Sequence, residues 1–108
     1  MTFPIQITFH DMDRSPMLEH LINDKAARLA RFHPAITQLQ VAVTSETRHS
    51  PSTREYRVRL DVHVKGKEYA ITRQGNEDAF VAARDAFDAA RRLLDDDIDV
   101  RRGFVKPH

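Results

Sequence analysis

Apolar and polar residues alternate along residues 4–10 of the chain. Ile5, Ile7 and Phe9 fall on one side of an extended backbone, and the polar residues between them fall on the other. A period of two predicts a half-buried β-strand in this segment.

The pattern changes to a helical period at residue 16. Ser15 followed by Pro16 suits an N-cap and a first helical position, because proline lacks a donor that the first turn would leave unused. His33-Pro34 ends the pattern, so a helix is predicted over about 16–32. Its apolar positions, spaced three and four residues apart, are Leu18, Leu21, Ile22, Ala26, Leu29 and Phe32.

Alternation returns in three further segments. Leu39, Val41 and Val43 alternate with polar or small residues, and after the polar loop 45–53 the segment 55–65 alternates strictly. The sequence Lys-Gly-Lys at 65–67 predicts a tight turn into a last strand over 67–73. Tyr56 and Tyr69 are both expected to point inward from these strands.

A second helix is predicted from Asn76, as the N-cap, to about Asp96, with Glu77 and Asp78 in its first turn. Its apolar stripe comprises Phe80, Ala83, Phe87, Ala90 and Leu94, broadened by Ala79, Ala86 and Leu93. The last residues show no period. We therefore expect one domain over 1–96 and a mobile C-terminal tail over 97–108.

The resulting order is β-α-β-β-β-α, an α+β fold. Strands joined by short turns pair antiparallel, which gives a four-stranded sheet with one apolar and one polar face. Both helices are expected on the apolar face, and the polar face is expected to stay open to solvent.

Composition narrows the function classes. The chain has 108 residues, no cysteine and no long apolar run, so we expect a cytoplasmic protein without disulfides or thiolate chemistry. The net charge is only +1, with 17 Lys/Arg against 16 Asp/Glu. Any contact with nucleic acid must therefore come from local placement of cations.

Candidate catalytic and metal-binding residues are few. There is no glycine-rich phosphate loop and no nucleophile motif. Asp11, Asp13 and Ser15 resemble part of a calcium loop but lack its glycine and closing glutamate. His10 and His63 both point to the polar sheet face, where a zinc pair is an alternative to ordinary surface histidines. We expect neither an enzyme nor a cofactor.

The spacing of the cations is more informative. Lys25, Arg28 and Arg31 recur every third residue and form one stripe beside the apolar face of the first helix. In the second helix Arg84 and Arg91 lie seven residues apart, and Arg92 directly follows Arg91. Two helices packed side by side would bring these cations towards one surface. The alternative to a binding surface is an ordinary solvated helix surface. Arg84, Arg91 and Arg92 are also spaced for ion pairs with aspartates along the helix.

The outward positions of the sheet carry Arg57, Arg59, His63 and Lys65 but no aromatic residue. Sheet-based readers of single-stranded RNA stack bases on aromatic side chains. Sequence-specific reading by the sheet is therefore disfavoured, while binding through shape and phosphates stays open.

The order and spacing of several segments resemble the ribosome hibernation-promoting factor family, also called ribosome-associated inhibitor A or sigma-54 modulation protein. The strand exit from Ile5 to Asp13, the helix end from Lys25 to Phe32 and the segment DAFVAARDAFDAARRLL carry the resemblance. Together they cover about residues 3–94.

This resemblance implies a double-stranded-RNA-binding-domain-like fold and a ribosome-bound translation inhibitor of the short type. The implied partner is the small ribosomal subunit with its rRNA, and the implied effect is to block the messenger RNA and transfer RNA sites. No membrane or small-molecule substrate is implied, and self-association is left open. The implied RNA-binding residues are Lys25, Arg28, Arg31, Arg84, Arg91 and Arg92. Phe9, Leu29, Phe32, Tyr56 and Phe80 match core positions of the family.

One segment departs from the family pattern. The second helix ends in Asp95, Asp96 and Asp97 with Asp99 soon after, where relatives often carry basic residues. Carboxylates facing RNA would repel it. This motivates an alternative: a stress-related protein-interaction module on the same scaffold that has lost RNA binding.

Overall fold

The computed structural model describes residues 3–47, 53–73 and 75–102, with side chains up to residue 97. Its elements are β1 (Ile5–His10), α1 (Pro16–Phe32), β2 (Ile36–Thr47), β3 (Arg54–Val64), β4 (Lys67–Thr72) and α2 (Ala79–Arg102). The predicted order β-α-β-β-β-α is confirmed, and so is the α+β class.

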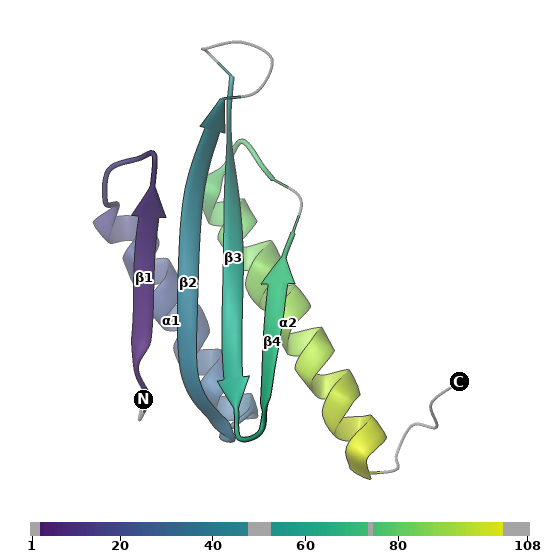
Figure 1. Ribbon diagram of the computed structural model, residues 1–108. Helices are drawn as coiled ribbons and strands as arrows, with labels where there is room; N and C mark the ends of the chain where they lie inside the picture. Colours follow the sequence, from purple (N-terminus) through teal and green to yellow (C-terminus); the bar gives the residue numbers. More distant parts are fainter. Residues whose placement is uncertain (1–2, 48–52, 74, 103–108) are drawn as a thin grey trace.

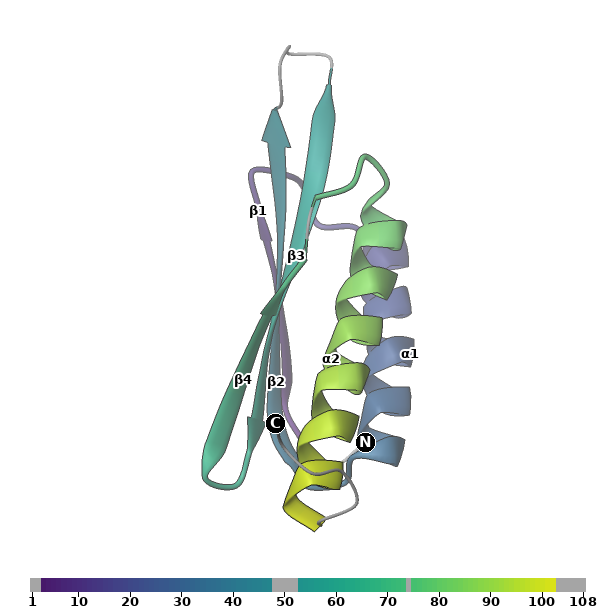
Figure 2. The same ribbon diagram turned by 90° about the vertical axis from the view of Figure 1, so that its right-hand side faces the viewer.

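The four strands form one mixed sheet in the order β1-β2-β3-β4. β1 pairs parallel with β2 because α1 carries the chain back between them, whereas β2–β3 and β3–β4 pair antiparallel. Figure 1 shows the strands side by side with β1 and β4 at the two edges. Figure 2 shows both helices on one side of the sheet, as predicted, and no described helix covers the other face.

The core lies between this sheet and the two helices. Residues on the inner face of strands β2–β4 meet one face of each helix, and most of the predicted apolar positions are buried. The largest fully buried side chains are Leu18, Ile22, Leu39, Val41, Val43, Val58, Leu60, Val62 and Leu94. Small residues in α2, including Ala83, Ala86 and Ala90, let that helix approach the sheet closely.

Two predicted core positions are wrong. Phe32 is 51% exposed and Leu93 is 42% exposed. Phe32 is the last residue of α1, so no further turn covers it, and Leu93 lies at the margin of the α2 stripe. Phe9, Tyr56 and Phe80 pack against the core as partly buried residues, and Tyr69 is buried.

The N-cap of α1 is the residue predicted from the sequence, whereas the N-cap of α2 is not. The Ser15 hydroxyl accepts a hydrogen bond from the Leu18 amide at 3.3 Å, so Ser15 is the N-cap. For α2 the cap is Asp78, whose Oδ1 accepts from the amides of Phe80 at 2.8 Å and Val81 at 3.4 Å. Asn76, the predicted cap, instead accepts from the Asp78 amide at 2.8 Å and pairs its backbone with Tyr56.

The end of α2 also differs from the prediction. The helix continues to Arg102, six residues past the expected end near Asp96, because nothing in residues 97–102 breaks a helix. The remainder of the predicted tail, 103–108, lies outside the described residues.

β2 begins earlier and ends later than its alternation indicates. A register irregularity between Ile36 and Gln38 lets both Ile36 and Leu39 face the core, although they lie three residues apart. A strict period of two does not detect such a strand start. At the other end, Ser45 is buried and strand pairing continues to Thr47, inside the segment predicted as a loop.

Candidate nucleic-acid interface

α1 and α2 lie side by side on the sheet and form a shallow groove between them. The groove is lined by residues of both helices, namely Lys25, Arg28, Leu29 and Phe32 from α1 and Phe87, Asp88 and Arg91 from α2. Leu29 and Phe87 are buried and form part of its apolar floor. Lys25 and Arg28 of α1 and Arg91 of α2 thus line one surface, whereas the other three predicted cations, Arg31, Arg84 and Arg92, do not line it.

Lys25, Arg28 and Arg31 form the α1 stripe, and their charges are free to contact a ligand. Lys25 is half-buried, while Arg28 and Arg31 are exposed. Within the described part of the chain, none of these three makes an ion pair or side-chain hydrogen bond. Arg31 lies on the same helix face, three residues beyond Arg28, but does not line the groove. The stripe is not neutralised by neighbouring carboxylates.

The three α2 cations are placed differently from one another. Arg91 lines the groove: its Cζ lies 3.7 Å from the centre of the Phe32 ring, and its Nε lies 3.7 Å from Asp95 Oδ2. Arg84 is exposed two helical turns earlier on the same side of α2 and does not line the groove. Arg92 is exposed and turned away from Arg91 by about 100°.

Several cations elsewhere in the protein form ion pairs with carboxylates. Arg59 Nη2 lies 3.2 Å from Asp61 Oδ1, and the hydrogen bond and charge of Asp61 raise the pKa of the Arg59 guanidinium. Arg14 is likewise bound to Glu19, whose hydrogen bond and charge raise the pKa of Arg14. The unpaired stripe of α1 therefore differs from these paired arginines.

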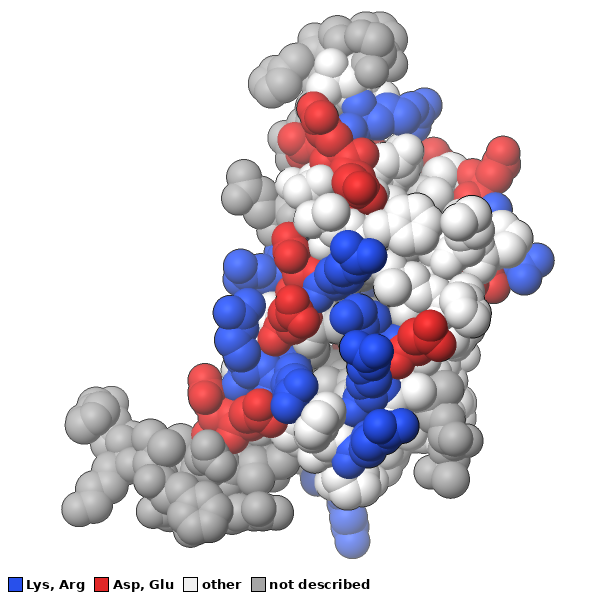
Figure 3. Space-filling view, turned by 180° about the vertical axis from the view of Figure 1, so that it is seen from behind, with Lys and Arg blue, Asp and Glu red and all other residues white. Residues whose placement is uncertain are grey.

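Figure 3 shows the face on which the helices lie. Lys and Arg gather in columns over the lower half of this face, with several carboxylates set between and beside them. The face is thus mixed but has a local excess of positive charge, on a molecule whose net charge is only +1.

The acidic end of α2 is largely used within the fold. Asp95 Oδ1 lies 2.7 Å from Nε2 of His33, a side chain that is only 5% exposed at the end of α1. Asp97 accepts from Lys67 Nζ at 3.2 Å and from the hydroxyl of Tyr69, both in β4. Two of the carboxylates expected to repel RNA, Asp95 and Asp97, therefore connect α2 to α1 and to the sheet. Asp96 is exposed, and Asp99 lies beyond the described side chains.

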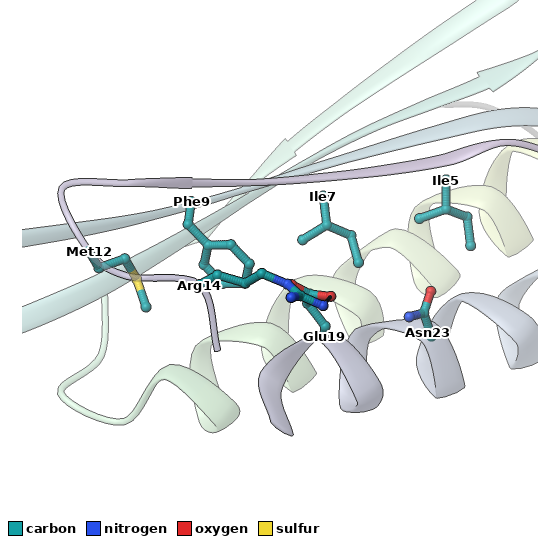
Figure 4. A pocket seen from close by; sticks show the side chains of 7 residues that line it. All are labelled: Ile5, Ile7, Phe9, Met12, Arg14, Glu19 and Asn23. Atoms are coloured by element: carbon teal, nitrogen blue, oxygen red, sulfur yellow. Dashed lines mark hydrogen bonds and ion pairs between the residues drawn. The ribbon is translucent and has the colours of Figure 1, made fainter. Parts of the chain in front are cut away.

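A larger hollow of about 600 Å³ lies between β1 and α1. Figure 4 shows Ile5, Ile7 and Phe9 pointing from β1 towards α1, with the Arg14–Glu19 pair across its middle. None of the six predicted RNA-binding residues lines it.

The zinc pair of His10 and His63, the alternative to ordinary surface histidines, does not form. His10 is opposite Thr44 and His63 is opposite Gln38, so the two histidines lie at opposite ends of the β2 register. In the described residues, no group of three or more histidine, aspartate or glutamate side chains is placed to hold a metal ion. No helix in the described ranges has the length and apolar character needed to cross a membrane.

The comparisons with solved structures agree on the fold. A ribosomal subunit interface protein from Coxiella burnetii superimposes with a TM-score of 0.71 at 17% sequence identity, over 85% of this chain and 93% of that one. The N-terminal domain of Protein Y from Thermus thermophilus gives a TM-score of 0.64 at 16% identity, over 87% of this chain and 96% of that one. A search of curated protein sequences found no match.

Fold and surface together define a small α+β protein with both helices on one side of a mixed sheet and an unpaired cation stripe along α1. The family model described as "Sigma 54 modulation protein / S30EA ribosomal protein" matches residues 5–99, and the chain belongs to this family. Its resemblance to the hibernation-promoting factors is thereby confirmed, and the family indicates a ribosome-associated protein that regulates translation.

Sequence reasoning missed two residues of this surface, Phe32 and Asp88. Phe32 continues the apolar period of α1, and only its position as the last helical residue signals exposure. Asp88 is one of the aspartates whose spacing suits ion pairs with the arginines of α2, but within the described chain it makes no ion pair and lines the groove.

Proposed function

We propose that this protein binds the small ribosomal subunit through rRNA phosphates and blocks the sites of messenger RNA and transfer RNA. The observation that carries the proposal is the α1 stripe of Lys25, Arg28 and Arg31, which is accessible and has no carboxylate partner among the described residues. Phosphate contacts by lysine and arginine release counterions and supply most of the affinity of such interfaces.

The action proposed is steric and involves no catalysis or cofactor. A compact body with extents of 49 × 33 × 19 Å has the bulk to occupy a channel that RNA would otherwise use. The compartment that follows from ribosome binding is the cytoplasm. Arg84, Arg91 and Arg92 are proposed as secondary contacts, with Arg91 the best placed because it shares the groove with Lys25 and Arg28.

The alternative, a protein-interaction module without RNA binding, was motivated by the acidic end of α2. Asp95 and Asp97 have partners within the fold, which weakens that motive. A pull-down enriched in one non-ribosomal protein, together with a ribosome pellet free of this protein, would favour the alternative.

The test is co-sedimentation of the protein with purified small subunits at several salt concentrations. Replacing Lys25, Arg28 and Arg31 together by glutamine is expected to weaken binding by at least about tenfold at low salt, because up to three phosphate contacts are lost. The fold should be retained, since these side chains carry no contact that the core needs.

The matched control replaces Arg59, Lys65 and Arg73 by glutamine, which removes the same charge from exposed positions in or beside β3 and β4. It is expected to bind within about threefold of the wild type, because it leaves the α1 stripe intact. Equal losses in both triple variants would mean that binding depends on total charge, and the assignment to α1 would fail.

A further inference from the structure

Phe32 is an exposed aromatic ring in the middle of cations. It is 51% exposed, although a phenylalanine side chain ordinarily lies in the core. Arg28 and Lys25 line the same groove from α1, and Arg91 approaches from α2. An exposed aromatic ring beside lysine and arginine is the combination that single-strand binding surfaces use to hold a base and its flanking phosphates.

The ring is held by Arg91. With Cζ 3.7 Å from the ring centre, the guanidinium lies against one face of Phe32 and makes a cation–π contact. The Arg91 side chain is itself placed by Asp95, at 3.7 Å. One face of the ring is therefore occupied, while half of the residue's surface still faces solvent.

The groove also contains a hydrogen-bond acceptor, the carboxylate of Asp88, which would not be expected in a site that binds phosphate alone. Asp88 is exposed, lines the groove and has no ion-pair partner within the described residues. A carboxylate repels phosphate but accepts hydrogen bonds from the exocyclic amines of bases. Cations at the rim, a ring and a carboxylate together suit a base with a phosphate on either side.

The groove is too small to enclose a ligand, so a ligand would contact it only at the surface. Its volume is about 140 Å³, below the ~300 Å³ at which pockets begin to enclose small-molecule ligands. A ligand here lies across the ring and is not engulfed, which fits one base of a longer strand.

We propose that Phe32 stacks on an unpaired base of the RNA that this helical face binds, with Arg91 supporting the ring from its other side. The proposal rests on the proposed function and adds to it a stacking contact that favours single-stranded over double-stranded RNA. Phe32 thereby joins the binding surface as its aromatic member, beside the cations that contact phosphates.

The variants that test it are Phe32→Leu, which keeps an apolar side chain but removes the ring, and Phe32→Trp, which enlarges the stacking surface. Met17→Ala is the matched control, because Met17 is a 75% exposed apolar residue of the same helix outside the groove. Binding to purified small subunits is measured over a series of salt concentrations for all three and for the wild type.

Phe32→Leu is expected to weaken binding about tenfold at every salt concentration, since a stacked base is lost and no phosphate contact is lost. The plot of affinity against salt should therefore run parallel to that of the wild type. Phe32→Trp is expected to bind within about threefold of the wild type, and Met17→Ala should be unchanged. Wild-type affinity in Phe32→Leu would overturn the proposal.

The chain has no tryptophan, so Phe32→Trp also provides a single fluorescent reporter. Its emission is expected to be quenched by small subunits and by a short single-stranded oligoadenylate, and less by an RNA duplex of the same length. Quenching by the subunit alone, with no response to the oligoadenylate, would show that the ring packs against a ribosomal protein and would overturn the proposal.

The two failures are distinguishable. If neither the wild type nor Met17→Ala pellets with the subunit, the proposed function fails, and the oligoadenylate response alone decides whether position 32 stacks on bases. If the wild type pellets and the emission of Phe32→Trp is not quenched, only the stacking proposal fails. A thermal melt of each variant separates loss of a contact from loss of fold, and the tryptophan variant decides if Phe32→Leu is destabilised.

Discussion

Single residues decide which charges of this protein face outward and which stay within the fold. His33 is buried at the end of α1, and its Nε2 lies 2.7 Å from Asp95 Oδ1. The neighbouring Asp96 is exposed and has no partner in the described chain. Adjacent aspartates of the same run therefore have different roles.

Replacing Asp95 by alanine is expected to lower the free energy of unfolding by about 1–2 kcal/mol. The change removes the partner of a nearly buried imidazole nitrogen, and an unsatisfied buried polar group is costly. Urea denaturation measures the effect.

Asp96→Ala is the control for this substitution and should change the free energy of unfolding by less than about 0.5 kcal/mol. Similar losses in both variants would mean that the contact with His33 contributes nothing.

The elements of the fold follow from their sequence signals to different degrees. α1 begins at Pro16 and ends at Phe32 as predicted, because a cap, a proline and a stop signal all agree. The start of α2 was wrong because Asn76, Glu77 and Asp78 are three polar residues in a row, and Asn and Asp are both good caps. The choice of Asp78 depends on the pairing of Asn76 with Tyr56, a contact between distant segments.

Asp78→Ala is expected to destabilise the protein by about 1 kcal/mol, because two amides of the first turn of α2 lose their acceptor. Thermal or urea unfolding measures this loss. Glu77→Ala, at an exposed neighbouring position, should be nearly neutral. A larger effect at Glu77 than at Asp78 would contradict the assignment of the cap.

The candidate surface was also only partly predictable. The stripe of Lys25, Arg28 and Arg31 follows from helical geometry alone, since residues three apart share a face. Which α2 cation meets it depends on how the two helices lie relative to each other, and this brings Arg91 into the groove and leaves Arg84 outside it. That relation is set by packing on the sheet and is not encoded in the period of either helix.

At the scale of the whole molecule, the number of cations that contact RNA sets an upper limit on how steeply the affinity falls with salt concentration. At most six cations were predicted to contact RNA, so the slope of log affinity against log salt should be no steeper than about −5. Each of Lys25, Arg28 and Arg31 replaced singly by glutamine should make the slope shallower by about one. Co-sedimentation over a salt series gives the slopes, and a wild-type slope well beyond this limit would reveal contacts outside the helical face.

The inward engagement of Asp95 and Asp97 has a consequence for how the protein finds its partner. Asp95 lies 3.7 Å from the helical Arg91 and Asp97 lies 3.2 Å from Lys67 in β4, and the net charge of the chain is only +1. At long range the two signs therefore largely cancel, and a distant polyanion meets a nearly neutral molecule. Attraction then grows only at close approach, where individual side chains replace the averaged field. If the helical face binds RNA as proposed, we expect the protein to adhere little to most nucleic acid and to be retained only where the local shape of the RNA admits that face.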